Sequence, residues 1–466
     1  MNFLQNRRIR RSNGAARCGA EVARAAMSAI LSALMMAAVA APSAADEASI
    51  VAPAVHGPAT GLADSAALRA TVFGTPPQNI APLPDKVPLI EINMSMPWAR
   101  QLPNVFWFDR QLRVWFSAQD KPAPLAIVIS GTGGDGNTTT LSTLRAVLYG
   151  AGYHVLTMPS PTFPGFIVST SSTGVAGDLQ QDGQDLYAAM QRIVAHLPRK
   201  VKITETDVLG YSLGGANAAV VKSIDAREHK LNIHRALMIN PPVSLFASVG
   251  RLDKLFAISI GSGDDGVERL YQKLFAQLAN LYRSSDRVQI NENFLLSAAA
   301  EVLKTDAEFS AAIALVFRID LMNMFFAGDL YAGTGVVVDP AHPPQVGDSL
   351  EQTARILRGK PFSEYFTKVF APYYLKHRRN STTESLIADN RLEIIGDALR
   401  NDPDYYVQTN SDDVILDSAE LAWLETTLGR KIAVYDHGGH LGTIGERQQV
   451  ADMLDMLGGR WQSPSR

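Results

Sequence analysis

Residues 206–224 read TDVLGYSLGGANAAVVKSI, and this stretch decides the fold. It starts as an apolar strand candidate, ends as a helix candidate over 216–224, and carries GYSLG (210–214) between them. A serine at a sharp strand-to-helix turn has a strained backbone, so the residues two positions away need minimal side chains. This context favours a nucleophile at Ser212 over the alternative, a plain glycine-rich turn.

Apolar runs alternate with amphipathic segments on both sides of this turn. Continuous apolar runs are typical of strands buried on both faces, and the alternation predicts an α/β fold, a mostly parallel sheet with helices on both faces. The expected strands are 87–96, 105–108, 113–118, 125–130, 153–160, 206–210, 233–240, 405–410 and 431–436. The expected helices of this core are 141–152, 185–197, 216–224, 418–429 and 445–457.

The alternation is interrupted by a long segment with a different pattern. Residues 245–400 are mostly helical in pattern, which predicts a cap or lid inserted between two strands of the sheet. Within it, AAIALVFRIDLMNMFF (311–326) is strongly apolar. Arg318 and Asp320 lie in its middle, so a buried helix or cap helix is favoured over a membrane span.

A second glycine-rich sequence, GGHLG (438–442), follows the last expected strand. A serine hydroxyl is a weak nucleophile until a base takes its proton, and histidine titrates nearest to neutral pH. The flanking glycines leave room for the His440 imidazole to reach the serine, so His440 is the predicted base. His437 is the competing candidate, and a surface histidine in a turn is the alternative without a catalytic role.

A carboxylate between the serine and the histidine in chain order is expected to orient the imidazole. The sequence NSDDVIL (410–416) ends a strand candidate, and Asp413 stands just before its apolar run, 27 residues before His440. Asp413 is therefore the predicted acid. A capping aspartate in a turn is the alternative role, since Asp is common in turns. The other candidates for the acid are Asp412, Asp417 and Asp436.

A tetrahedral intermediate needs two fixed N–H donors. The backbone of Leu213, directly after the serine, is one predicted donor. The other is predicted in the turn GTGGDG (131–136), at Thr132 or, as second choice, at Gly133. This turn lacks the P-loop lysine and the dinucleotide-binding glycine pattern, so a phosphate-binding loop is disfavoured.

These pieces occur in the order oxyanion loop, serine, aspartate, histidine, and together they resemble the α/β-hydrolase superfamily of serine hydrolases, which includes esterases and lipases. The resemblance covers roughly 87–245 and 400–460, and the two parts of the predicted core are 87–244 and 401–466. It implies an α/β-hydrolase fold, the same roles for the three side chains, and an insertion that shapes the substrate pocket. The chain departs from the pattern in two places: it has SGT (130–132) where many relatives have His-Gly, and its insertion matches no named cap.

The N-terminal residues have the pattern of a secretory signal peptide. Four arginines within residues 7–11 precede an apolar stretch over 25–41, and small residues then lead to a polar break. We therefore expect residues 1–45 to be removed on export to the periplasm or the medium, with a retained membrane anchor as the alternative. The single cysteine, Cys18, lies in this segment, so the mature chain is expected to form no disulfide. Residues 46–86 are rich in Ala and Pro, which predicts a linker or a loosely packed arm.

The composition narrows the class of partner. The chain has 466 residues, 43 basic and 46 acidic, and a net charge of −3, which gives no indication of a nucleic-acid partner. No H-E-x-x-H sequence or other cluster with metal-ligand spacing is present, so neither a metal nor an organic cofactor is implied.

The predicted reaction is hydrolysis of a small-molecule or lipid-like carboxylic ester through an acyl-serine intermediate. The alternatives are a peptidase, amidase, thioesterase or acyltransferase with the same triad, or a non-catalytic binding protein with this fold. The Phe325–Phe326 pair either fills the core of the cap or holds an apolar acyl group, because ligand pockets are mostly apolar.

Overall fold

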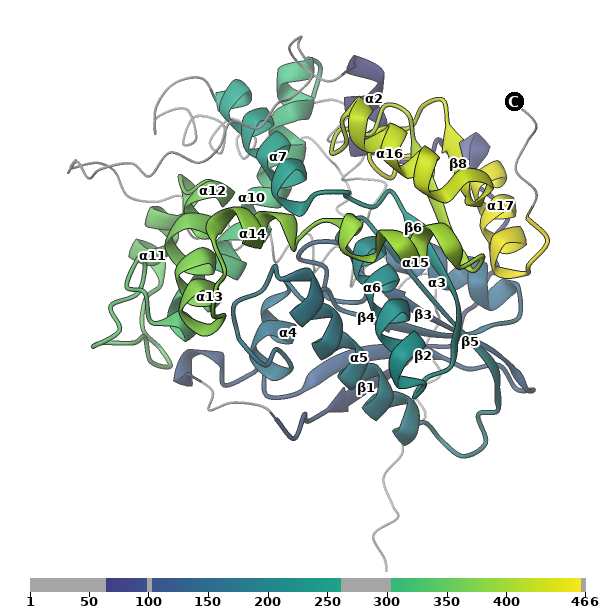
Figure 1. Ribbon diagram of the computed structural model, residues 1–466, viewed down its shortest axis with the longest axis horizontal. Helices are drawn as coiled ribbons and strands as arrows, with labels where there is room; N and C mark the ends of the chain where they lie inside the picture. Colours follow the sequence, from purple (N-terminus) through teal and green to yellow (C-terminus); the bar gives the residue numbers. More distant parts are fainter. Residues whose placement is uncertain (1–63, 99–102, 261–302, 462–466) are drawn as a thin grey trace, which may run out of the picture. The chain divides into compact units, whose positions relative to one another are not determined.

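The computed structural model describes residues 64–98, 103–260 and 303–461 (Figure 1). Nearly all of them belong to one compact unit of the chain, formed by 41–270 together with 305–466. The predicted signal peptide, and the first part of the predicted arm, lie outside the described residues.

Eight strands form one sheet, in the order β1-β2-β4-β3-β5-β6-β7-β8. The strands are β1 (Ile90–Met94), β2 (Leu112–Ser117), β3 (Ala123–Ile129), β4 (His154–Met158), β5 (Ile203–Tyr211), β6 (Ile233–Ile239), β7 (Tyr405–Asn410) and β8 (Ile432–Tyr435). β2 is antiparallel to both of its neighbours, β1 and β4, and all other pairs are parallel. This order confirms the predicted α/β-hydrolase fold.

Helices cover both faces of the sheet (Figure 1). They are α3 (Thr139–Gly150), α5 (Leu179–His196), α6 (Leu213–Glu228), α16 (Ser418–Leu428) and α17 (Arg447–Leu457). Successive side chains of a strand point to opposite faces, so the side chains of β3 belong to two separate hydrophobic clusters, one on each face of the sheet. Ile127 and Ile129 pack with α5 and α6, whereas Ala126 and Val128 pack with α3 and α17. Burial on both faces explains why the core strands are continuous apolar runs.

One strand prediction is wrong. The apolar run 105–108 forms no strand; a 3-10 turn, η2 (Asn104–Phe106), occupies this place. β1 and β2 pair directly with each other, so this run lies in their connection and has no free ladder partner. Only Phe106 of the run is well buried, while Trp107 and Phe108 are exposed. A short apolar run without a partner strand therefore ends as a turn.

The arm contains an ordered helix that its composition did not indicate. α2 (Ser65–Phe73) begins at Asp64, whose carboxylate accepts a hydrogen bond from the backbone of Ala66. Leu68 is fully buried. Residues 64–86 thus differ from a loose linker, because one face of α2 packs against the rest of the unit. The short 3-10 turn η1 (Pro77–Asn79) follows.

The chain between β6 and β7 forms the cap, as far as the structure describes it. Its elements are α7 (Leu245–Ile260), α10 (Asp306–Ala332), α11 (Glu351–Arg358), α12 (Phe362–Tyr365), η3 (Phe366–Phe370), α13 (Ala371–His377), α14 (Thr383–Ala388), η4 (Leu392–Ile395) and α15 (Gly396–Asn401). By length and composition α10 is apolar enough to cross a membrane, and half of its most apolar window is buried inside the protein. It contacts α7, α2 and α11, as a core helix of the cap does.

Candidate active site

Ser212 stands at the turn between β5 and α6, with a φ of 53° and a ψ of −130°. A positive φ is strained for a residue with a side chain, as the sequence motif predicts. The two glycines of the motif are sterically required. A Cβ at Gly210 would clash with the backbone of Gly214, and a Cβ at Gly214 would clash with carbonyl groups at the end of β3. Local sterics therefore explain both the motif and the position of the serine at the end of β5, beside the cavity.

His440 lies on the loop after β8 and reaches the serine. Its Nε2 is 3.0 Å from the Oγ of Ser212, and both residues are buried. The competing candidate, His437, is exposed to solvent. The structure thus brings the predicted base to the predicted nucleophile and leaves the competitor outside the site.

Asp413 is on the other side of the imidazole. Its two carboxylate oxygens lie 3.0 and 3.2 Å from the Nδ1 of His440. Asn240 Nδ2 donates to Asp413 Oδ2 at 2.7 Å, and the backbone N–H of Ile415 donates to Oδ1 at 3.1 Å. A carboxylate surrounded by donors accepts from Nδ1–H, which leaves Nε2 free to accept the serine proton.

The three alternative aspartates have other contacts. Asp412 accepts the backbone N–H groups of the two glycines that precede His440, at 3.1 and 2.8 Å, and so holds the histidine loop. Asp417 caps α16 and forms an ion pair with Arg251 at 2.6 Å. Asp436 is exposed. Only Asp413 of the four, all of which are described, contacts the imidazole.

The two predicted oxyanion donors both line the cavity beside the serine. Leu213 is the first residue of α6, where a backbone N–H has no partner within the helix. No hydrogen bond to the N–H of Thr132 is found among the described residues. The N–H of Gly133, the second choice, already donates to Thr162 Oγ1 at 2.9 Å. Thr132 is therefore favoured over Gly133 as the second oxyanion donor, because the N–H of Gly133 already has an acceptor.

Three supporting residues were not identified from the sequence. Thr71 of α2 accepts a hydrogen bond at 2.9 Å from the backbone N–H of His440, so the arm helps to hold the histidine loop. Asn410 Nδ2 donates to the carbonyl of Gly439 at 2.7 Å. Asn240 carries a φ of 47° at the end of β6, which aims its amide at Asp413. Its position directly before two prolines was the available signal, because such a sequence marks a turn.

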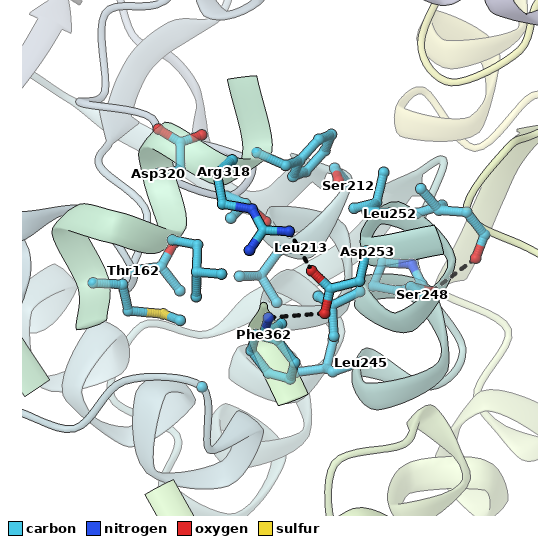
Figure 2. A pocket seen from close by; sticks show the side chains of 18 of the residues that line it. Thr162, Ser212, Leu213, Leu245, Ser248, Leu252, Asp253, Arg318, Asp320 and Phe362 are labelled. Atoms are coloured by element: carbon cyan, nitrogen blue, oxygen red, sulfur yellow. Dashed lines mark hydrogen bonds and ion pairs between the residues drawn. The ribbon is translucent and has the colours of Figure 1, made fainter. Parts of the chain in front are cut away.

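A small cavity of about 90 Å³ lies beside Ser212 (Figure 2). The sheet side supplies polar atoms of Ser212, Thr132 and Thr162, and the cap supplies a mostly apolar wall. The apolar residues of this wall are Leu245, Val249 and Leu252 from α7 and Ala314, Phe317, Leu321 and Met324 from α10. Typical ligand pockets hold roughly 300 Å³ or more, so this one accepts a small group as it stands.

The structure distinguishes the two roles considered for the Phe325–Phe326 pair, filling the core of the cap or holding an acyl group. Phe325 is fully buried and packs edge-on against Tyr365, with ring centroids 5.5 Å apart. Phe326 packs edge-on against Phe106 at 5.7 Å. Neither ring lines the cavity. The pair belongs to the core of the cap, and the roof of the cavity comes from other turns of α10.

Replacing Phe325 by alanine is expected to lower the free energy of unfolding by about 3–5 kcal/mol, because a buried ring leaves a cavity behind. The ratio of activities on short and long acyl esters should stay unchanged. Val316→Ala, at a position of α10 that is 60% exposed, is the matched control, with an expected change within about 0.5 kcal/mol. Urea unfolding and ester assays measure both quantities. A changed acyl-length preference with unchanged stability would contradict this assignment.

One group of side chains among the described residues has metal-ligand spacing: Glu205, Asp207 and His234. It lies near the start of β5 and β6, away from the end of β5 where the serine stands. Arg235 pairs with Glu205 at 3.0 Å and lies 4.0 Å from Asp207, so a cation already neutralises this group. Burial raises the pKa of Asp207 to about 6. We therefore do not assign a metal-binding role to Glu205, Asp207 and His234.

Comparisons with known proteins give distant likenesses. No family model and no curated protein sequence matches the chain. Among solved structures, the chain is similar to an esterase from Pyrococcus furiosus (12% identity, TM-score 0.39, covering 84% of this chain and 98% of that one). It is also similar to a protein of Legionella pneumophila described as a hydrolase, with 12% identity and a TM-score of 0.42, covering 86% of this chain and 96% of that one. A third similar structure is the thioesterase domain from the curacin biosynthetic pathway, with 13% identity and a TM-score of 0.36, covering 79% of this chain and 99% of that one. By its own strand order and by the backbone geometry of the Ser212 turn, the chain is a protein of the α/β-hydrolase fold.

Proposed function

We propose that the chain hydrolyses carboxylic esters through an acyl-serine intermediate, with a Ser212–His440–Asp413 triad. The proposal rests on one observation, the unbroken line of hydrogen bonds from the serine Oγ through both imidazole nitrogens to the carboxylate. Such a line activates a hydroxyl that is otherwise a weak nucleophile.

In the proposed mechanism, the Oγ of Ser212 attacks the ester carbonyl while His440 Nε2 takes its proton. The negative charge that develops on the carbonyl oxygen is stabilised by the backbone N–H groups of Leu213 and Thr132. Asp413 holds Nδ1–H and stabilises the imidazolium form. The imidazolium then protonates the leaving alcohol, the neutral imidazole activates a water molecule, and this water releases the acid from the serine.

The cavity favours an ester over a peptide. Its wall on the cap side is mostly apolar, and its volume of about 90 Å³ suits a short acyl group. A peptide, by contrast, brings backbone N–H and C=O groups that need hydrogen-bond partners when they are buried. Peptidase, amidase, thioesterase and acyltransferase activity are the alternatives, and a non-catalytic binding protein is a further one.

The test is a substrate panel with the purified chain. We expect p-nitrophenyl esters with two to four acyl carbons, a range that we choose for roughly the size of this cavity, to be hydrolysed faster than long-chain esters. Rapid mixing should show a nearly stoichiometric burst of p-nitrophenol, because the acyl-enzyme accumulates. Faster turnover of p-nitroanilides or thioesters of the same acyl group would move the chain to the amidase or thioesterase class. Absence of turnover and of labelling by a fluorophosphonate would indicate a binding protein.

We also propose that the enzyme is exported to the periplasm or the medium without residues 1–45 and acts on a small-molecule or lipid-like ester, with no nucleic acid, membrane span or cofactor. The support is the basic and apolar pattern of the N-terminus. N-terminal sequencing of protein from the native host tests the cleavage. A chain that begins at Met1 would contradict it.

A further inference from the structure

One carboxyl group in the wall of the cavity takes no part in the proposed mechanism. Asp320 lies on α10 and lines the cavity together with Ser212 and Thr132. Its carboxyl group packs directly on the oxyanion loop, since a Cβ at Gly133 would clash with it. The carboxyl group is therefore next to the loop that the proposed mechanism uses to bind the ester carbonyl.

No hydrogen bond or ion pair to Asp320 is found among the described residues. The other two charged side chains of the wall neutralise each other, because Arg318 pairs with Asp253 at 3.1 Å (Figure 2). Asp253 also accepts the backbone N–H of Phe362 at 2.8 Å. Burial without a compensating partner raises the pKa of the Asp320 carboxyl to about 8. Within the described part of the chain, Asp320 is therefore an acid of the wall without a counter-ion.

A carboxyl that is half-buried and has no partner among the described residues costs free energy, so its presence needs a reason. A purely structural role does not explain a carboxyl group at this position, because the neighbouring wall positions on α10 are apolar: Phe317, Leu321 and Met324. An apolar residue at 320 would pack against them without that cost. Among the described residues no cation pairs with Asp320, and in a cavity beside a nucleophile a positively charged substrate can supply one.

We propose that Asp320 is a specificity-determining residue that binds an ammonium group on the acyl part of the ester. The proposal rests on the ester hydrolysis proposed above and names the class of substrate, a short acyl ester with a primary ammonium group. A nearby cation favours the ionised carboxylate, so binding of the ammonium group converts Asp320 to its charged form. The oxyanion loop and Asp320 then fix the two ends of the acyl group.

The test compares esters that differ only in charge. One pair is p-nitrophenyl 3-aminopropanoate and p-nitrophenyl butanoate, and a shorter pair is the aminoethanoate and the propanoate. In each pair an ammonium group replaces a methyl group of nearly the same size. We expect the wild-type chain to prefer the ammonium ester in kcat/KM, and Asp320→Asn to reduce that preference by at least about 30-fold, because a buried charge pair loses one partner.

Two controls separate this role from a change in folding. Asp306→Asn makes the same substitution on the same helix, outside the cavity, and should leave the preference unchanged. In the wild-type chain, propylammonium chloride should inhibit butanoate hydrolysis competitively, whereas 1-propanol at the same concentration should not. This second measurement does not depend on the folding of any variant.

The outcomes are distinct. Equal kcat/KM for the two members of both pairs in the wild-type chain, or a preference that Asp320→Asn leaves intact, overturns the assignment of Asp320 while ester hydrolysis stands. Absence of turnover of all four esters contradicts the proposed function, and the assignment falls with it. A preference that disappears with Asp320→Asn and persists with Asp306→Asn supports the assignment.

Discussion

Replacing Ser212 by alanine is expected to lower turnover of a p-nitrophenyl ester by about 10⁶-fold and to abolish labelling by a fluorophosphonate. The hydroxyl is the atom that forms the covalent bond in the proposed mechanism, and its described partner is the imidazole of His440. Alanine tolerates the φ of 53° at this turn no worse than serine does, so the melting temperature should change little. Steady-state kinetics, labelling and thermal unfolding measure the three effects. Substantial acyl-enzyme formation by Ser212→Ala would exclude Ser212 as the nucleophile.

The coupling within the triad gives a second measurement on the same variant. His440→Ala should cost nearly as much as Ser212→Ala, and the double variant should be little slower than either single variant. The reason is that the hydroxyl and the imidazole act as one unit. Once either group is removed, removing the other causes little further loss of rate. A double variant whose rate falls by the product of the two single effects would contradict this mechanism.

The second large effect is expected from Asp413→Asn, which should lower kcat by about 10⁴-fold. The carboxylate accepts from His440 Nδ1, from Asn240 Nδ2 and from the backbone of Ile415. An asparagine has one acceptor oxygen in place of two and adds an N–H₂ donor. If that group faces the imidazole, it stabilises the tautomer with the proton on Nε2, and this tautomer cannot accept the proton of the serine.

Asp412→Asn is the matched control for this prediction, since it makes the same change one residue earlier. Asp412 binds backbone N–H groups of the histidine loop, so its loss should loosen the loop and reduce kcat far less than Asp413→Asn does. The pH dependence of kcat and the binding of a fluorophosphonate should be retained in this variant. A larger loss for Asp412→Asn than for Asp413→Asn would show that the acid is assigned one residue too late.

Much of the fold was predictable because its signals are local. A strand that is buried on both faces must be apolar throughout, and each of the runs predicted as strands from 125–130 onward overlaps a strand of the sheet. The turn at Ser212 requires glycine on both sides for steric reasons that involve only neighbouring backbone atoms and the end of β3. The two predictions that were wrong concern segments whose structure depends on a distant part of the chain. Residues 105–108 have no strand to pair with, and α2 is held by packing against segments that are distant in sequence.

The sequence by itself therefore determined the α/β fold, the serine turn and the choice of His440 as the histidine that the glycines admit. The tertiary structure decided the rest. Asp412 and Asp413 are adjacent and chemically identical, so only the positions of the histidine loop and of Asn240 distinguish them. That Asp320 has no partner among the described residues likewise emerges only from the packing of α10 on the oxyanion loop. Hydrogen bonds and burial depend on which distant groups come together, and a chain read in order does not contain that information.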